Sequence, residues 1–354
     1  MYHSFRPGKT WYDTQGKRIQ AHGGSLLYAD GIYYWYGENK EGITGTATGE
    51  RCPHWHHGVR LYSSVDLYNW RDEGVIMIDR EDPHSPFYPA NIMDRPHILY
   101  NRRTGRYVMW AKCSRKDFGA CFFAVCFASD IRGPYTLLPE VDCAPYHAGD
   151  FDLVEHGDKA YVIYENPHSE MICQTLTDDY TGLTDEVSSH IPEKCPPFVR
   201  EAPAYFERGG RKFLLTSGTT GYYPNASRLY EITDFHGEWI DLGDPCEGDA
   251  AKNSFHAQFS SVFRHPRIED LYLALGDRWL TDLPLDLPDM NDLFQRMFDP
   301  DAAPLPENFS FSDLSDENTG EAEYVWLPIL FREDGTPYLK WRRSWTAEDF
   351  CKRR

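Results

Sequence analysis

The sequence predicts an all-β protein, a five-bladed β-propeller with four strands in each blade. Five hairpins of similar plan recur along the 354 residues, and a second strand pair with a Ser/Thr-Asp turn follows four of them. Aromatic residues make up 15% of the chain, beside 27 Gly and 24 Pro. Such a composition favours strands and turns over helices.

The first hairpin covers residues 18–40, where an Asp30-Gly31 turn separates two apolar runs. Further hairpins with turns of the same kind lie at residues 95–112, 149–165, 202–218 and 260–279. The second strand pairs lie near 61–70, 126–135, 173–182 and 230–240, and residues 324–341 supply the last two strands. Four-stranded units repeated at this spacing indicate a propeller, because radial repetition shields the edges of the sheets. An array of β-sandwiches is the alternative.

We expect residues 1–354 to form one domain, with blades that begin near residues 23, 95, 150, 202 and 260. Residues 280–322 interrupt the fifth unit and are rich in Asp, Pro and Asn. This composition predicts a surface insertion with a short helix around residues 291–298.

The formal net charge of −19 excludes nucleic acid and anionic membranes as partners, since both would repel so acidic a surface. The longest apolar run, residues 121–128, is too short to span a bilayer, and residues 1–7 do not resemble a signal peptide. Nine Cys without a C-x-x-C pair indicate reduced thiols, which predicts a cytoplasmic protein. The oligomeric state stays open.

Polar residues precede the first strand of every predicted blade, at equivalent places. They are His22, Asp94, Asp150, Glu201 and Gln258. Because the first strand of a blade lines the axis of a propeller, we expect these side chains to meet at one mouth of the channel. Gly23 and Gly24 would let a ligand approach the backbone there, and Glu38 ends the second strand of the first blade.

Carboxyl groups that share one pocket acquire different pKa values, so that one is held protonated while another stays ionised. A protonated carboxyl group beside an ionised one is the arrangement that cleaves a glycosidic bond. The alternative is that acidic residues before strands are ordinary turn residues, which is harder to sustain for a set at equivalent places in all five repeats.

Several motifs together resemble glycoside hydrolase family 43, and most closely its exo-β-1,3-galactanase branch (subfamily 24). They are IQAHGG…YYWYGENK, RPHILYN…GRYVMW, REAPAYF, TSGTTGYYPN, LGDRW and EYVWLPI, spread over residues 18–345. The resemblance implies a five-bladed propeller that hydrolyses glycosides with inversion and needs no cofactor.

The resemblance also implies roles for single residues. Glu201 matches the general acid, and Asp150 matches the carboxylate that positions this acid and raises its pKa. Most of the family has an Asp as general base where this chain has His22, and Gln258 matches a Gln that is proposed to handle the water in the galactanase branch. His22 is the alternative for this role, because an imidazole titrates near neutrality. The substrate-binding positions are His22, Glu38, Asp94, Phe118 and Thr220. Asp94 stands where the branch usually has Glu, and Phe118 where it usually has Tyr.

We therefore expect an inverting glycosidase that releases galactose from the non-reducing end of β-1,3-linked galactans or galactosides. An α-L-arabinofuranosidase or β-xylosidase of the same family, and a catalytically silent sugar-binding propeller, are the alternatives. Inversion leads us to expect about 6.5–9.5 Å between Glu201 and Gln258. Cys52, His54, His56 and His57 match no zinc-site spacing, and no metal site is predicted.

Overall fold

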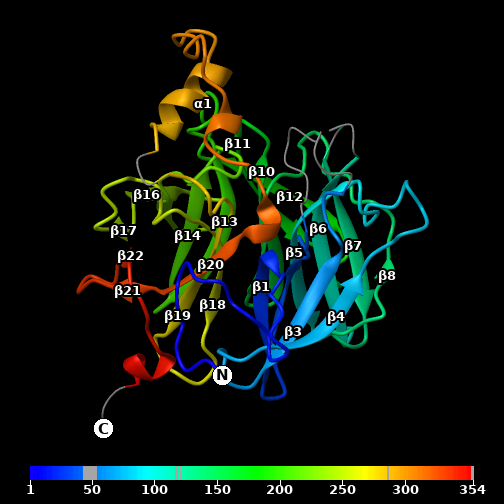
Figure 1. The fold of residues 1–354 in the computed structure, drawn as a ribbon. Helices are drawn as coiled ribbons and strands as arrows, with labels where there is room; N and C mark the ends of the chain where they lie inside the picture. The colour runs from blue at the N-terminus through cyan, green and yellow to red at the C-terminus, as the bar shows by residue number, and fades with distance from the viewer. Residues whose placement is uncertain (43–53, 116–118, 120, 285–286, 352–354) are drawn as a thin grey trace.

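The computed structural model describes residues 1–42, 54–115, 119, 121–284 and 287–351. It is an all-β propeller built of four-stranded antiparallel sheets around a central axis (Figure 1). The strands of each four-stranded sheet follow one another in chain order, as the repeated strand pairs of the sequence predict.

The first sheet contains β1 (His22–Ala29), β2 (Ile32–Glu38), β3 (Val59–Ser64) and β4 (Arg71–Met77). The second contains β5 (Ile92–Asn101), β6 (Arg106–Ser114), β7 (Phe122–Ala128) and β8 (Thr136–Leu137). The third contains β9 (Phe151–His156), β10 (Lys159–Asn166), β11 (Glu170–Leu176) and β12 (Leu183–His190). The fourth contains β13 (Arg200–Arg208), β14 (Arg211–Gly218), β15 (Arg228–Ile232) and β16 (Trp239–Gly243). The fifth contains β18 (Gln258–Arg264), β19 (Tyr272–Arg278) and β20 (Glu323–Pro328).

The predicted count of five is wrong, because the described residues form six sheets. The additional sheet contains β17 (Cys246–Glu247), β21 (Leu330–Phe331) and β22 (Pro337–Lys340). The last strands of the chain were expected to complete the fifth unit. Instead β22 pairs in parallel with β17 and antiparallel with β21, so that the fifth sheet keeps three strands.

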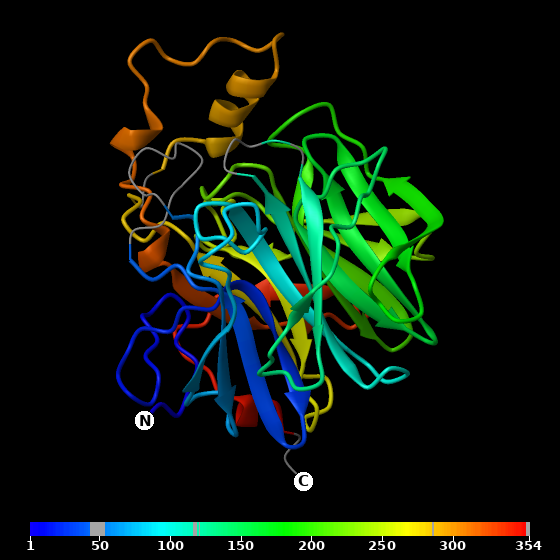
Figure 2. The ribbon, with the colours of Figure 1, turned by 90° about the vertical axis from the view of Figure 1, so that its right-hand side faces the viewer.

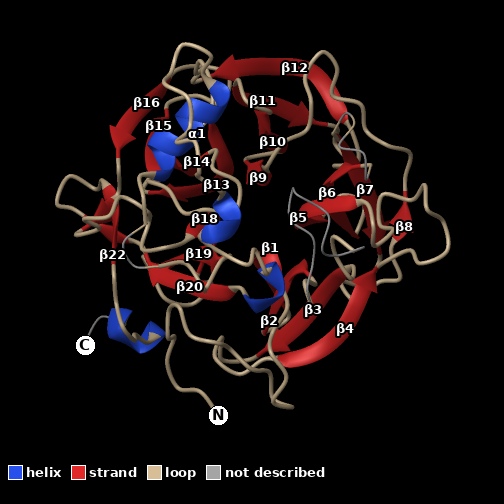
Figure 3. Cartoon of the chain, turned by 45° about the horizontal axis from the view of Figure 1, so that its top comes forward, coloured by secondary structure: helices blue, strands red, loops and turns tan. Residues whose placement is uncertain are grey.

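Figure 3 shows β1, β5, β9, β13 and β18 nearest the axis and β4, β8, β12 and β16 at the periphery. The side chains of β2 show how a sheet is buried on both faces, because successive residues of a strand point to opposite sides. Tyr33 and Trp35 pack among side chains of β19 and β20, whereas Tyr34 and Tyr36 pack among side chains of β5 and β6. This aromatic run therefore fills the two spaces that separate the first sheet from its neighbours.

The two ends of the chain meet beside the first and fifth sheets. The backbones of Phe5 and Trp345 exchange hydrogen bonds of 2.9 and 3.2 Å, and their rings stack with centroids 4.2 Å apart. The amide of Gly8 also donates to the carbonyl oxygen of Tyr324 at 2.8 Å. The ring of sheets is thus closed by contacts between segments from opposite ends of the sequence.

The predicted insertion rises above the sheets, as Figure 2 shows, and carries the helix α1 (Met290–Phe298) that the sequence predicts. Asp289 caps this helix by accepting bonds from the amides of Asn291 and Asp292. The short 3₁₀ helices η1 (Phe311–Asp313) and η2 (Thr319–Glu321) follow, and η3 (Ala347–Phe350) lies near the C-terminus. No helix in the described ranges has the length and apolar character needed to cross a membrane.

Candidate active site

The five polar residues predicted for the mouth lie directly before the innermost strands or within their first three residues. In three of the sheets a β-bulge follows directly, between His22 and Ser25, between Asp94 and His97, and between Glu201 and Ala204. The residue next in sequence has a left-handed backbone, with φ of +60° at Gly23, +53° at Arg95 and +47° at Ala202. Bulges re-aim side chains at the ends of strands, and here the same device recurs in three sheets.

Each of these residues has a cross-strand partner at the end of the second strand, and these partners form a second set of polar groups. They are Glu38, Lys112, Glu165, Ser217 and Asp277. Among the partners, only Glu38 was predicted as a site residue. The other four partners could have been found in the sequence. Each lies near the end of the aromatic or apolar strand that follows a hairpin turn.

Glu201 is a buried carboxyl group near the start of β13. Its Oε1 accepts a hydrogen bond of 2.9 Å from Nε2 of Gln258. Burial raises the pKa of Glu201 well above its usual range, and the negative charges of Asp150 and Glu165 raise it further. This carboxyl group is therefore suited to carry a proton at neutral pH.

Asp150 has the opposite electrostatic environment. Although burial raises its pKa, Arg95 and Lys112 outweigh this effect, and the pKa of Asp150 lies below its usual range. The Oδ2 atom lies 2.8 Å from Nη2 and 3.0 Å from Nε of Arg95, and Oδ1 lies 3.5 Å from Nζ of Lys112. The pKa values of two carboxyl groups of the mouth are thus shifted in opposite directions, upward for Glu201 and downward for Asp150.

The amide of Gln258 is fully hydrogen-bonded by the protein. Its Oε1 accepts bonds from Nη2 of Arg95 at 2.5 Å and from Nε1 of Trp279 at 3.0 Å. Because both of these groups can only donate, the NH₂ side must face Glu201 and Ser217, each 2.9 Å away. The separation of 6.5–9.5 Å expected between Glu201 and Gln258 is therefore wrong, since the two side chains are in direct contact.

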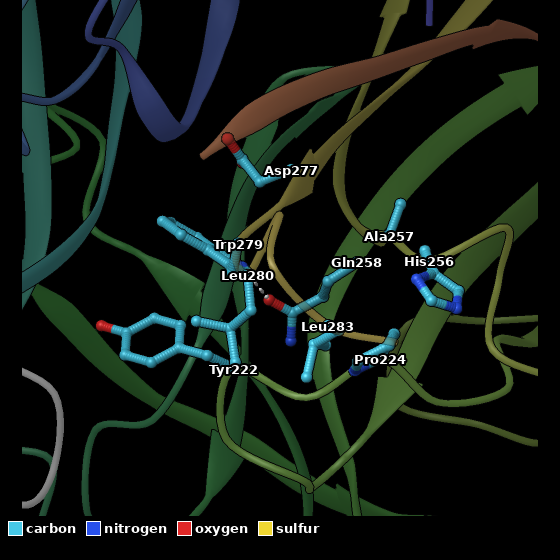
Figure 4. Close-up of a pocket in the computed structure, with 9 residues that line it drawn as sticks. All are labelled: Tyr222, Pro224, His256, Ala257, Gln258, Asp277, Trp279, Leu280 and Leu283. Atoms are coloured by element: carbon cyan, nitrogen blue, oxygen red, sulfur yellow. Dashed lines mark hydrogen bonds between the residues drawn. The ribbon is translucent and has the colours of Figure 1, made fainter. Parts of the chain in front are cut away.

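A small cavity adjoins this amide (Figure 4). Its polar and aromatic lining comes from Gln258, Asp277, His256, Tyr222 and Trp279. The ring centroids of Tyr222 and Trp279 lie 5.1 Å apart. Leu280 and Leu283, from the start of the insertion, close the cavity with apolar side chains. The insertion thus supplies one wall of the mouth beside Gln258.

Arg95 is the cation at the centre of the mouth, and the sequence analysis did not single it out. Its side chain is 6% exposed and contacts both Asp150 and Gln258, while its backbone amide donates to Oε1 of Glu38 at 3.0 Å. Its Nη1 atom is buried without a hydrogen-bond partner among the described residues. Arg95 is part of the RPH motif that the sequence analysis quoted. Its left-handed backbone and the inward direction of its side chain follow from the bulge, which the motif does not reveal.

Glu38 and Asp94 lie on either side of Arg95 along the mouth. Burial raises the pKa of Glu38 to about 7, although Lys40, whose Nζ lies 3.0 Å from Oε2, opposes this shift. Asp94 is half-buried, 3.3 Å from Nζ of Lys112, and accepts a bond of 2.7 Å from Nε1 of Trp55. Both carboxyl groups therefore belong to the same polar network as Asp150.

His22 is enclosed rather than presented at the mouth. Its ring is 0% exposed and stacks on Tyr324 with centroids 4.8 Å apart. Nδ1 lies 2.8 Å from Oδ1 of Asp277, and Nε2 lies within hydrogen-bond distance of both Gln20 and Tyr324. With both ring nitrogens engaged, His22 supports the strand ends around Asp277 and does not line the cavity.

Thr220 is likewise fully buried, in the loop that follows β14. Its hydroxyl donates to the carbonyl oxygen of Tyr223 at 2.6 Å and accepts a bond of 2.7 Å from Nδ2 of Asn225. These contacts fix the loop that carries Tyr222. Phe118, the remaining predicted substrate-binding residue, lies outside the described residues.

The loop with the CPHWHHG motif contributes an aromatic residue to the mouth. Trp55 lies between Lys40, 4.9 Å above its ring, and Tyr222, whose ring centroid is 6.4 Å away. Its neighbours His54, His56 and His57 take part in no group of metal-ligating side chains within the part of the chain that the structure describes, and Cys52 lies outside it. The signal that the sequence analysis missed here is the Trp in the middle of the motif.

Gly23 and Gly24 are required by packing within the first sheet, which differs from the predicted approach of a ligand. A Cβ atom at Gly24 would lie 1.9 Å from the carbonyl oxygen of Tyr36, and one at Gly23 would lie 2.4 Å from Oε1 of Glu38. The bulge brings the two backbones this close, and the missing side chains let Glu38 fold over the strand end.

We predict that Gly24→Ala destabilises the protein by about 3 kcal/mol, because the backbone of β2 cannot move away from the new methyl group without breaking the ladder. Urea denaturation followed by circular dichroism would measure the change. Gly182→Ala is the control, since its Cβ would meet nothing closer than Thr177 at 3.5 Å. It should change stability by no more than about 0.5 kcal/mol, and equal effects of the two variants would contradict the prediction.

The comparisons with known proteins agree with this geometry. A family model described as glycosyl hydrolases family 43 matches residues 18–245. None of the curated proteins matches the chain. A solved GH43 β-1,3-galactosidase has 28% sequence identity and a TM-score of 0.78, and the match covers 98% of this chain and 64% of that one. The chain therefore spans less than two thirds of that protein.

Two further solved structures match over nearly the whole chain. A GH43 β-1,3-galactosidase with galactodeoxynojirimycin has 26% identity and a TM-score of 0.77, and the match covers 97% of this chain and 100% of that one. A variant exo-β-1,3-galactanase from Phanerochaete chrysosporium with β-1,3-galactotriose has 21% identity and a TM-score of 0.75, with coverages of 97% and 68%. The shared fold thus extends beyond the residues that the family model matches.

Proposed function

Because the chain belongs to glycosyl hydrolases family 43, we propose that it releases galactose from the non-reducing end of β-1,3-linked galactosides, with inversion at the anomeric carbon. In this proposal residues 1–354 act as one catalytic domain on an oligosaccharide or polysaccharide and need no cofactor. The two solved β-1,3-galactosidases above 25% identity support the choice of galactose and linkage.

The observation that carries the proposal is the opposite electrostatic environment of Glu201 and Asp150. A glycosidase needs one carboxyl group that holds a proton until the leaving oxygen accepts it. Burial and the charge of Asp150 keep this proton on Glu201, and Arg95 keeps Asp150 ionised. We assign the general acid to Glu201 and its electrostatic support to Asp150.

The bond from Gln258 fixes which oxygen of Glu201 delivers the proton. Nε2 donates to Oε1, so the proton is best held on Oε2, where it can face the glycosidic oxygen. As the bond to the leaving group breaks, Glu201 gives up its proton and becomes ionised. Glu38 and Asp94 are the residues that we propose to bind hydroxyl groups of the terminal sugar.

The attacking water is assigned to Gln258. Inversion needs the sugar between this amide and Glu201, so the contact between the two side chains has to open when the substrate binds. An amide oxygen can orient water by accepting a hydrogen bond, but it is a weak base. Since Arg95 and Trp279 already occupy both acceptor positions of Oε1, the water has to replace one of these donors when the substrate binds. His22, with no exposed surface and both nitrogens engaged, is the weaker candidate for this role.

A panel of substrates tests the proposed function. We expect hydrolysis of β-1,3-galactobiose and of nitrophenyl β-D-galactoside, measured as released galactose or nitrophenol. Faster hydrolysis of nitrophenyl α-L-arabinofuranoside or β-D-xyloside would assign a different sugar to the same site. Tight binding of galactose without turnover of any substrate would identify a sugar-binding propeller instead.

We predict that hydrolysis of a β-galactoside produces α-galactose first. In an inverting reaction, water attacks the face of the sugar opposite to the leaving group. Proton NMR of the anomeric signals during the first minutes of the reaction would measure this, before mutarotation mixes the two forms. β-Galactose as the first product would mean retention and would contradict the roles of Glu201 and Gln258.

A further inference from the structure

Glu165, at the end of β10, is a buried carboxyl group that the roles assigned above leave unused. Its backbone amide donates to the carbonyl oxygen of Asp150 at 2.9 Å, one position beyond the paired residues Phe151 and Tyr164. Residues directly opposite each other in an antiparallel ladder point to the same face. Glu165 and Asp150 therefore place two carboxyl groups side by side, and both are at most 6% exposed.

The cations of the mouth are unequally shared between these two carboxyl groups. Arg95 and Lys112 both contact the carboxylate of Asp150. Within the described ranges, no cationic side chain forms an ion pair with Glu165, whose Oε1 accepts a bond of 3.1 Å from the amide of His168. A buried carboxyl group without a cation resists ionisation and exerts a strong field once it is ionised.

The strand that carries Glu165, β10, packs against β13, the strand that carries Glu201. Glu165 and Asp150 are also the two groups whose negative charge raises the pKa of Glu201. The general acid thus faces two carboxyl groups of the third sheet. Only Asp150 forms ion pairs with Arg95 and Lys112, whereas Lys112 acts on Glu165 at longer range and lowers its pKa.

We propose that Glu165 is a second positioning residue of the general acid, which acts with Asp150 to hold the proton on Glu201 in alkaline solution. This inference rests on the proposed function only in naming Glu201 as the acid. Glu165 touches no reacting atom, since it acts through the charge that it places behind Asp150.

The direction of the pH effect follows from the charges around Glu165 and Glu201. These groups are Asp150, Arg95, Lys112 and the turn of His168, together with the two glutamates themselves. Burial, together with Asp150, raises the pKa of Glu165 to about 7. Below this pH Glu165 is mostly neutral, whereas above it the new negative charge makes the proton on Glu201 harder to remove. The basic limb of the activity profile is therefore extended to higher pH.

The test is the pH dependence of kcat/KM for Glu165→Gln, which keeps the size of the side chain and an acceptor for His168. We expect the basic limb to move down by about one pH unit, from a Coulomb interaction at an effective dielectric constant of about 20. Glu165→Leu is a second neutral variant, to be used if the amide substitution disturbs folding. The basic limb should move in the same direction in this variant. Glu170→Gln, on the neighbouring strand β11, is the matched control and should leave the limb unchanged.

A measurement without substrate separates this inference from the proposed function. The carboxyl carbon of Glu201 can be titrated by NMR in protein labelled with ¹³C-glutamate, with Glu201→Gln to assign the signal. A lower pKa of Glu201 in the neutral variants supports the inference even if no galactoside is hydrolysed. An unchanged pKa of Glu201 in both neutral variants, with an unchanged basic limb wherever activity is measurable, would overturn it and leave Glu165 with the structural role of fixing the His168 turn.

Discussion

Glu201→Gln is expected to lower kcat on β-1,3-galactobiose by about 10³-fold, because the amide keeps the shape of the side chain but has no proton to deliver to the leaving sugar. Binding should survive. The oxygen of the new amide can still accept the bond from Nε2 of Gln258, so the mouth keeps its hydrogen bonds. Steady-state kinetics would measure the loss of turnover, and calorimetry with galactose would measure the retained affinity.

The leaving group provides the internal control for this variant. An aryl galactoside with a strongly acidic phenol needs little protonation as it departs, and we expect it to lose much less rate than the disaccharide. Glu207→Gln, on the same strand but at its far end beside His156, should leave both substrates unaffected. Equal losses on the two substrates would show that Glu201 has a role other than proton donation.

Arg95→Met is expected to destabilise the protein by about 3–5 kcal/mol, the range found when one partner of a buried ion pair is removed. The substitution leaves the carboxylate of Asp150 with Lys112 as its only cation in the described mouth, and Oε1 of Gln258 loses one of its two donors. The pKa of Asp150 should rise for the same reason. Urea denaturation would measure the loss of stability, and we expect hydrolysis to fall sharply as well.

Two variants control for Arg95→Met. Arg95→Lys keeps the charge but has a single nitrogen, which cannot serve Asp150 and Gln258 in the geometry of the guanidinium group. It should recover part of the stability and little of the activity. Arg103→Met removes an ion pair between side chains that are 72% and 77% exposed, and its effect should be less than about 1 kcal/mol. A loss no larger in Arg95→Met than in Arg103→Met would contradict the prediction.

The parts of the fold that could be predicted are those that local sequence determines. The Asp30-Gly31 turn and the continuous aromatic run of β2 encode a hairpin in a few neighbouring residues, and both are present in the structure. The repetition of this plan then indicates a propeller. The position of Glu201 near the start of β13 followed from the same repetition.

The additional sheet was missed because its strands meet only in three dimensions. β17 is two residues long and lies far from β22 in the sequence. No periodic pattern therefore predicts that these two strands pair. The role of Arg95 was missed for a related reason. Its direction depends on a bulge and a backbone φ of +53°, which an Arg adopts only when the surrounding contacts require it. The bond between Gln258 and Glu201 likewise depends on how two sheets approach each other.

The contact between Phe5 and Trp345 has a consequence for biosynthesis. A chain that leaves the ribosome from its N-terminus holds Phe5 unpaired until Trp345 has been made. Individual hairpins can form earlier, since their strands are neighbours in sequence. The carboxyl groups of the mouth come from every large sheet, so their burial awaits the closure of the ring. These carboxyl groups therefore stay hydrated during translation. They lose their water only in the final step of folding, when packing between the first and fifth sheets can offset the free-energy cost of dehydration.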